Sequence, residues 1–250
     1  MDLRRRLAHH CNSSEISSGV HDDERNVLVA VLCDDAPSLQ RLLEEGRLAK
    51  RCHDETPLHL AARIGSVNCL ISLLRHNMDV DCRSQRDDAT PLHTAAQHGQ
   101  SSCVEALVKV GADVRARDRK AHTPVFLAAL HKHSECVKIL LEAELTLKEL
   151  DVTSGEWNLL HVAASNDDLN TMRVVLEHRQ DLLDAQDLYG RTALHVAAEH
   201  GHQYCLRLLL EYGANLDVVD NEGYTALRVS QLCDDFQCSR LLQDNCLRAD

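Results

Sequence analysis

The sequence predicts an all-α protein built as a solenoid of stacked repeats, and three observations support this. A tetrapeptide, most often Thr-Pro-Leu-His or Thr-Ala-Leu-His, recurs along the chain, an Ala pair follows most copies, and a Leu or Val pair comes later. The tetrapeptides begin at residues 56, 90, 123, 158, 192 and 225, so the steps are 34, 33, 35, 34 and 33 residues. Self-similarity at such a period is typical of stacked-repeat proteins. An array of this kind offers an extended surface rather than a closed pocket.

Each repeat is predicted to contain two short amphipathic helices joined by a tight turn. The first helix carries the tetrapeptide and the Ala pair, whose small side chains let neighbouring helices approach closely. Gly65, Gly99 or Gly201 then interrupts the pattern, and a second apolar segment ends in the Leu or Val pair. Polar stretches with alternating Val or Leu link the repeats, as in residues 113–118 and 215–220. We expect them to form β-hairpin-like fingers that project from the stack.

This pattern resembles the ankyrin repeat, whose unit is a finger turn followed by two antiparallel helices. The resemblance covers about residues 25–243, and the fingers that match best are residues 187–192 and 220–225. The fourth full repeat begins with Asn158 rather than Thr, after a long finger from Leu145 to Trp157. Elsewhere the usual finger glycine is replaced by Asp54, Asp88, Ala121 and Glu156. The resemblance therefore implies an ankyrin-repeat solenoid with β-hairpin-like finger loops.

We interpret the array as seven units with a tail at each end. An N-terminal cap spans residues 25–55, five fuller repeats begin at 56, 90, 123, 158 and 192, and a C-terminal cap begins at 225. Terminal repeats need a polar outer face, which fits Arg228, Ser230 and Gln231 in place of His, Ala and Ala. We expect residues 1–24 to be disordered and residues 244–250 to be a short tail. Met1 and the capped end lead us to expect a complete chain.

The eleven cysteines do not indicate a metal site or a disulfide framework. No Cys-x-x-Cys pair occurs, so the spacing of structural zinc sites is missing. A free cysteine in a core behaves as a small apolar side chain. We expect burial for the five that lie 13 residues after a repeat begins, namely Cys69, Cys103, Cys136, Cys205 and Cys238. Reduced thiols indicate a cytoplasmic or nuclear protein, and no apolar run suggests a membrane span or a signal peptide.

The histidines and glycines give no indication of catalysis. The resemblance implies that His59, His93, His161 and His195 of the tetrapeptides hydrogen-bond the finger backbone and tie repeats together. The ten glycines are scattered singly through turns, so there is no phosphate-binding loop. We expect no enzymatic activity, no cofactor and no metal.

The chain is acidic, with 39 Asp and Glu against 27 Lys and Arg and a net charge of −12. This balance disfavours nucleic acid as a direct partner and favours a protein with a basic surface. Acidic pairs begin at residues 34, 167 and 234, in the turn between the two helices. They either cap the second helix or form an acidic binding edge. Asp87 and Asp88 lie at a fingertip, where no helix follows directly.

Partner contacts in the ankyrin family concentrate on the fingers and on the concave face of the first helices. Trp, Tyr and Arg carry most interface energy, so Trp157, the single tryptophan, is a candidate anchor; alternatively, its ring packs on the long finger before it. The residues that the resemblance places on these surfaces are Arg63, Ile64, Asp87, Asp88, Gln97, His98, His122, His131, Trp157, Asn166, Tyr189, Arg191, Glu199, His200 and Tyr224.

The predicted function is non-catalytic: a monomeric adaptor or scaffold that binds a protein partner through its fingers and concave face, without membrane insertion. Three alternatives stay open. An IκB-like inhibitor of a transcription factor would suit the acidic balance, although residues 1–24 contain no Asp-Ser-Gly degron. A substrate-recognition subunit of a ubiquitin ligase would need a SOCS box after the array, where only residues 245–250 follow. The last alternative is the detached regulatory array of an ankyrin-containing enzyme.

Overall fold

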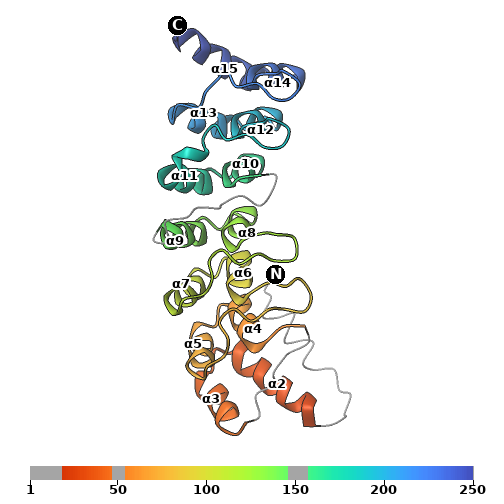
Figure 1. Cartoon of the computed structure of the whole chain (residues 1–250), viewed down its shortest axis with the longest axis vertical. Helices are drawn as coiled ribbons and strands as arrows, with labels where there is room; N and C mark the ends of the chain where they lie inside the picture. The colour runs from red at the N-terminus through yellow and green to blue at the C-terminus, as the bar shows by residue number, and fades with distance from the viewer. Residues whose placement is uncertain (1–18, 47–53, 146–156, 250) are drawn as a thin grey trace. The chain divides into compact units, whose positions relative to one another are not determined.

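The computed structural model describes residues 19–46, 54–145 and 157–249, which fold into pairs of short helices (Figure 1). The chain divides into two compact units, residues 1–124 and residues 125–250, called here the first and the second unit. No β-strand occurs in the described parts of either unit, although Val219 and Thr225 form an isolated antiparallel bridge. The described fingers are therefore tight turns rather than two-stranded ribbons.

In the described part of the first unit, the first helix of each pair packs on the first helix of the next pair, and the second helices pack on one another. The first helices are α2 (Gly19–Leu32), α4 (Pro57–Ile64) and α6 (Pro91–Gln97). The second helices are α3 (Ala36–Glu44), α5 (Val67–Arg75) and α7 (Ser101–Val110). Helix α4 packs between α2 and α6, and α5 packs between α3 and α7. Two parallel layers of helices result, as the recurring apolar pattern predicts.

The second unit repeats this arrangement. Its first helices are α8 (Pro124–Leu130), α10 (Leu159–Ser165), α12 (Ala193–Glu199) and α14 (Ala226–Leu232). The first residue of α8, Pro124, belongs to the first unit. Its second helices are α9 (Ser134–Leu145), α11 (Leu169–His178), α13 (Gln203–Glu211) and α15 (Phe236–Ala249). Helix α12 packs between α10 and α14, while α11 packs on α9 and α13. A 3-10 helix, η1 (Gln180–Leu182), follows α11.

The core is aliphatic and follows the columns predicted from the sequence. Both members of the Ala pairs at 61, 95, 128, 163 and 197 are fully buried, which lets the first helices approach closely. The five in-column cysteines are at most 1% exposed, as predicted. Burial raises the pKa of the Cys136 thiol to about 11 and the pKa of Cys69 and Cys238 to about 12. Because the thiolate is the reactive form, these side chains are inert core residues. Cys33 and Cys233 are exposed.

The acidic pairs between helices have a structural role. Asp34, Asp167 and Asp234 adopt left-handed backbone conformations with φ of 52°, 52° and 56°, at the turn position that Gly65, Gly99 and Gly201 occupy in other repeats. The second aspartate of each pair caps the following helix. Its carboxylate accepts a backbone N–H three residues ahead, as in Asp35 with Ser38 (3.2 Å), Asp168 with Thr171 (3.2 Å) and Asp235 with Cys238 (3.0 Å). Helix capping is therefore confirmed for these pairs.

Both ends of the described array differ from the predicted boundaries. Helix α2 begins at Gly19, so the predicted disordered tail through residue 24 is too long. Helix α15 continues to Ala249, so the segment predicted as a tail from residue 244 is helical almost to its end. Arg240 and Asp244 stabilise it as an ion pair one turn apart, at 3.9 Å.

No helix within the described ranges combines the length and the apolar character that a membrane span requires.

Candidate protein-binding surfaces

The tetrapeptide histidines tie each repeat to the following finger, as the family resemblance implies. The Nδ1 atom of His59 lies 2.8 Å from the Thr56 hydroxyl and accepts the Thr56 N–H at 3.4 Å. Its Nε2–H donates to the carbonyl oxygen of Ala89 at 2.9 Å. Because a carbonyl oxygen only accepts, Nε2 must carry the proton. Equivalent bonds of 2.7–3.0 Å join His93 to His122, His161 to Arg191, and His195 to Tyr224.

His93, His161 and His195 are held neutral. Burial lowers the pKa of His93, His161 and His195, against the opposing influence of the carbonyl that each one binds. A second proton would also remove the acceptor at Nδ1. Phe126 and Arg228, which replace histidine in two repeats, have no ring nitrogen with which to make the bond. The histidines therefore position the fingers and leave their tips free to contact a partner.

An inward-facing aspartate shapes three of the fingers. Asp118, Asp187 and Asp220 each lie five residues before the residue that begins the next tetrapeptide. Each carboxylate accepts backbone N–H groups two and four residues ahead, at 2.8–2.9 Å. The fingertip then turns through a left-handed residue, with φ of 63° at Ala121, 74° at Gly190 and 80° at Gly223. These aspartates are not among the predicted contact residues, although their constant offset from the tetrapeptide is visible in the sequence.

In the second unit, three of the predicted contact residues gather around one guanidinium group. The central carbon of the Arg191 guanidinium lies 5.0 Å from the Tyr189 ring centre and 5.9 Å from the Trp157 ring centre. Its Nη1 donates to Glu199 at 3.1 Å. The Trp157 ring also lies beside the His161 ring, with the centroids 6.3 Å apart. We call Trp157, Tyr189 and Arg191 the aromatic–arginine cluster.

Asp187 fixes the arginine of this cluster. Its side chain is fully buried, and Oδ2 accepts from Nε of Arg191 at 2.9 Å while Oδ1 accepts two fingertip amides. Burial alone would raise the pKa of Asp187, but the hydrogen bonds and charge of Arg191 more than offset this, so the pKa is lowered. The carboxylate is therefore ionised and holds Arg191 in place before any partner arrives.

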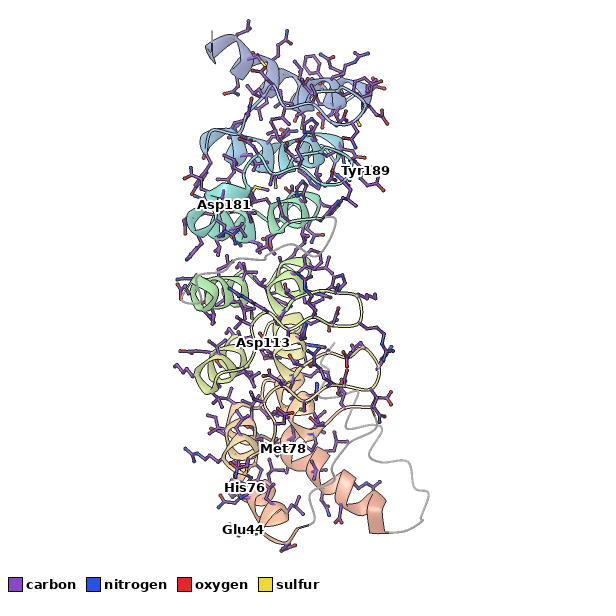
Figure 2. All side chains as sticks on the ribbon, viewed as in Figure 1. Glu44, His76, Met78, Asp113, Asp181 and Tyr189 are labelled. Carbon is purple, nitrogen blue, oxygen red and sulfur yellow. The ribbon has the colours of Figure 1, made fainter. Side chains whose placement is uncertain are left out.

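The aromatic–arginine cluster is rigid at its backbone and open at its side chains. Asn221 of the next finger donates its N–H to the Tyr189 carbonyl and its Nδ2–H to the Leu188 carbonyl, both at 2.9 Å. Yet Leu188 and Tyr189 are 65% and 59% exposed, and Figure 2 shows Tyr189 at an edge of the second unit. Trp157 is partly buried, on Arg191 and His161. The finger residues before it lie outside the described part, so packing of the ring on that finger stays a prediction.

The remaining predicted residues of the first helices have local partners. Ile64 is only 9% exposed, so its assignment to a contact surface is wrong: its side chain is in the core, beside the turn glycine. Arg63 forms an ion pair with Glu55 at 3.2 Å. Three histidines donate Nδ1–H to the carbonyl four residues earlier at 2.9 Å, namely His98, His131 and His200. Asn166 donates to the carbonyl of Leu130 at 3.1 Å. Gln97, His122, Glu199 and Tyr224 are partly or fully exposed.

Asp87 and Asp88 are engaged in their own finger. Asp87 accepts hydrogen bonds from the Ser84 hydroxyl and from the Ala89 N–H. Burial acts to raise the pKa of Asp87, but these bonds outweigh it and the pKa is lowered. Asp88 adopts φ of 58° at the fingertip and lies 3.7 Å from Arg83. Asp87 thus shapes the finger, and both acids are exposed.

The acidity is not shared evenly between the units. Residues 1–124 contain 18 acidic side chains and 17 Lys or Arg, a net charge of −1. Residues 125–250 contain 21 acidic side chains and 10 Lys or Arg, a net charge of −11. Nearly all of the net charge therefore belongs to the unit with the aromatic–arginine cluster. In the ranges that the structure describes, no three His, Cys, Asp or Glu side chains are grouped to hold a metal ion.

The fold and the fingers together define a class of repeat protein. The family model for ankyrin repeats matches residues 27–118, 115–185 and 180–250, and the chain therefore belongs to the ankyrin repeat family. Among solved structures, the ankyrin repeat domain of Bcl-3, titled a unique member of the IkappaB protein family, superposes with a TM-score of 0.72 at 25% identity, covering 87% of this chain and 97% of that one. The human ASB11 ankyrin repeat domain gives 0.73 at 24% identity, covering 92% and 98%. These confirm the predicted fold.

Curated relatives match over shorter stretches. The human transient receptor potential cation channel subfamily A member 1 is 38% identical over 91 residues, which is 36% of this chain and 8% of the channel. Human ankyrin repeat and SOCS box protein 16 is 42% identical over 60 residues, which is 24% of this chain and 13% of that protein. The matched stretches thus span small fractions of these relatives.

Proposed function

We propose that this chain is a non-catalytic adaptor that binds a protein partner, with the aromatic–arginine cluster of the second unit as the anchor. Ankyrin repeats are protein-interaction modules, which supports the general role. The observation that carries the specific proposal is the packing of Arg191 against two aromatic rings at an exposed fingertip. We further propose that it works as a monomer in the cytoplasm or nucleus; the buried free thiols support such a reducing compartment.

The chemistry of the cluster suits an interface anchor. Trp, Tyr and Arg are the residues most enriched at interface hot spots. Asp187 and Glu199 hold the guanidinium, and the next finger holds the backbone, so little side-chain freedom remains to be lost on binding. The net charge of −11 in the second unit favours a partner with a basic surface, which would be attracted before contact. Hydrophobic contact with Tyr189 and Leu188 then slows dissociation.

Quantitative affinity capture from cells tests this anchor. Wild type is compared with Tyr189→Ala and Trp157→Ala, and with Tyr204→Ala as the matched control, because Tyr204 is 68% exposed but lies on α13 rather than on a finger. We expect each cluster variant to weaken capture of the same partner by about tenfold, the loss for a hot-spot side chain, mainly through faster dissociation. The control should bind as wild type does. Equal losses for all three variants would contradict the proposed anchor.

The basic character of the partner has its own test. Association between opposite charges slows as salt rises, because the screening length falls from about 10 Å at 0.1 M to about 3 Å at 1 M. We expect the captured partner to associate more slowly at high salt, with little change in dissociation. An association rate that does not depend on salt concentration would contradict the basic surface of the partner but not the aromatic–arginine anchor.

A second candidate function is recognition of substrates for a ubiquitin ligase. The identity of 42% over 60 residues to an ankyrin and SOCS box protein favours it. In that case the partner captured through Tyr189 should be ubiquitinated, and its half-life should lengthen when the chain is depleted. A stable partner would favour the adaptor function, and a transcription factor as partner would favour an IκB-like inhibitor.

A further inference from the structure

We propose that the fingers of the first unit form a second binding surface, of opposite charge, for an acidic segment of a protein. We call Arg86, Arg119 and Lys120 the cationic fingertip surface. It shares no residue with the aromatic–arginine cluster and lies in the other unit. The whole-chain charge of −12 conceals it, because a net −11 of that charge belongs to residues 125–250.

Two neighbouring fingers are bonded together at their tips. The backbone N–H of Arg119 donates to the carbonyl of Asp87 at 2.8 Å, and Nη2 of Arg119 donates to the carbonyl of Gln85 at 3.1 Å. Arg83 links the same fingers through Nη1, which donates to the carbonyls of Asp88 at 2.8 Å and Arg117 at 2.6 Å. These bonds bring Arg86 of one tip beside Arg119 and Lys120 of the next.

The acids of these fingers are hydrogen-bonded within the fingers or paired with Arg83, although Asp87 and Asp88 are exposed. The Asp118 side chain is only 9% exposed and accepts the N–H groups of Lys120 and His122 at 2.9 and 2.8 Å. Asp87 accepts from Ser84 and Ala89 within its own turn. Asp88 is paired with Arg83 at 3.7 Å. These acids are therefore engaged by groups other than the side chains of Arg86, Arg119 and Lys120.

The cations, by contrast, are left facing outward. Arg86, Arg119 and Lys120 are all exposed, and none forms an ion pair with a described residue. Like charges placed together without compensation raise the local positive potential and attract anions. Arginine also binds carboxylates through paired, geometrically fixed N–H donors. The surface is thus suited to two or three carboxylates spaced along an extended chain.

A protein segment fits this surface better than a nucleic acid does. Nucleic-acid binding requires a continuous basic stripe that neutralises many phosphates. Here the basic surface is limited to two fingertips, and the net charge of −12 opposes a long polyanion. A short acidic segment can engage the fingertips without extending over the rest of the chain. With a basic partner on the second unit, the same molecule would bridge two different proteins.

The test uses the full chain and a fluorescein-labelled oligoglutamate peptide, with the matched oligoglutamine peptide as a control, followed by fluorescence anisotropy. Arg86→Gln combined with Lys120→Gln removes two charges without breaking the hydrogen bonds that join the fingers. The matched control is Arg75→Gln with Lys109→Gln, which makes the same charge change in the same unit but on α5 and α7. We expect the fingertip pair to weaken oligoglutamate binding about three- to tenfold, and the control pair less than about twofold.

Several outcomes would overturn the proposal. Equal weakening by both pairs would show attraction to the overall charge alone, and no oligoglutamate binding by wild type at low salt would show that no such surface exists. Tight binding of a labelled DNA strand, weakened by the fingertip pair, would make this a nucleic-acid surface instead. Thermal unfolding checks that the variants fold; if the fingertip pair is unstable, Arg86→Glu replaces it with the same expected direction. Tyr189→Ala should leave oligoglutamate binding unchanged, so failure here is distinguishable from failure of the proposed anchor.

Discussion

The fingers of the two units differ in composition, although each turns through a left-handed residue. The second unit places Gly190 and Gly223 at the left-handed fingertip position, with φ of 74° and 80°. The first unit places Asp88 and Ala121 there, with φ of 58° and 63°. An L-residue in this region costs about 1–2 kcal/mol relative to its normal conformation. In the finger with Ala121, the inward-facing Asp118 and the His93 bond therefore keep the turn although glycine is missing.

The surfaces of the same fingers differ more than their backbones. The first unit presents exposed cations, whereas the second presents Tyr189, Leu188 and a large excess of acids. Underneath, both units share the buried Ala pairs, the in-column cysteines and the histidine bonds. The repeats therefore share the core and the finger backbone, while the side chains at the tips differ from one repeat to another. Recognition chemistry can therefore differ between two parts of one array.

The shared core predicts the largest effect, and it should be similar in the two units. Leu107 of the first unit and Leu140 of the second occupy the same repeat position and are both fully buried. We expect Leu107→Ala and Leu140→Ala each to lower the free energy of unfolding by about 2–5 kcal/mol, because each leaves a cavity. Urea denaturation measures the loss.

The control for this prediction is Leu188→Ala. Its side chain is exposed at a fingertip, so the change should stay within about 0.5 kcal/mol. An unchanged urea midpoint for either core variant would break the assumption of a common core.

Most of that core could be predicted from the sequence, because the repeat spacing places each side chain on a known face. The positions of Cys69 and Cys205 followed from their offset, and both are fully buried. The family resemblance supplied the role of the histidines, and the observed bonds agree. Ile64 was misplaced because one residue of offset at a helix end separates a solvent-facing position from a core position.

The finger surfaces could not be predicted to the same depth. The grouping of Trp157 with Arg191 depends on the path of a finger, and that path depends on the buried carboxylate of Asp187. A net charge summed over the whole chain says nothing about which acids face inward. The cationic fingertip surface of the first unit was missed for that reason. Charge has to be assigned to exposed atoms before it indicates a partner.

Acid should destabilise the repeats with a buried tetrapeptide histidine more than the C-terminal repeat, where Arg228 replaces it, in the range just below pH 6.5. The pKa is lowered by burial in His93 of the first unit and in His161 and His195 of the second. Below the ordinary pKa of about 6.5 these histidines bind protons in the unfolded chain but not in the folded chain. Their contribution to the free energy of unfolding is therefore fully present above about pH 6.5 and decreases as pH falls toward the folded pKa. Each histidine can contribute at most about 1.4 kcal/mol per pH unit.

Hydrogen exchange followed by mass spectrometry measures this in each unit separately. We expect amides of α10 and α12 to lose protection between pH 7 and pH 5.5 to a greater extent than those of α14 after correction for the intrinsic rate. His195→Gln should remove part of the pH dependence in the second unit alone. Identical pH dependence in α12 and α14 would contradict the assignment. A further loss of stability at lower pH is expected from Asp187, because its pKa is lowered in the folded state. Its carboxylate stabilises the fold fully above the ordinary pKa of about 3.9, and this stabilisation is lost as pH falls below that value.

The smallest effect expected comes from exchanging the fingertip residues themselves. Ala121→Gly should raise the free energy of unfolding by about 0.5 kcal/mol, because glycine removes a left-handed cost of about 1–2 kcal/mol while adding about 0.4–1 kcal/mol of freedom to the unfolded chain. The reciprocal change, Gly190→Ala, should destabilise: an added Cβ would lie 2.6 Å from Oδ1 and 2.8 Å from the backbone nitrogen of Asn221. Thermal unfolding of both variants gives the signs. If Ala121→Gly destabilised the protein as Gly190→Ala does, residue 121 would not adopt the left-handed conformation of Gly190. The backbone conformation under the cationic fingertip surface would then be different from the one described.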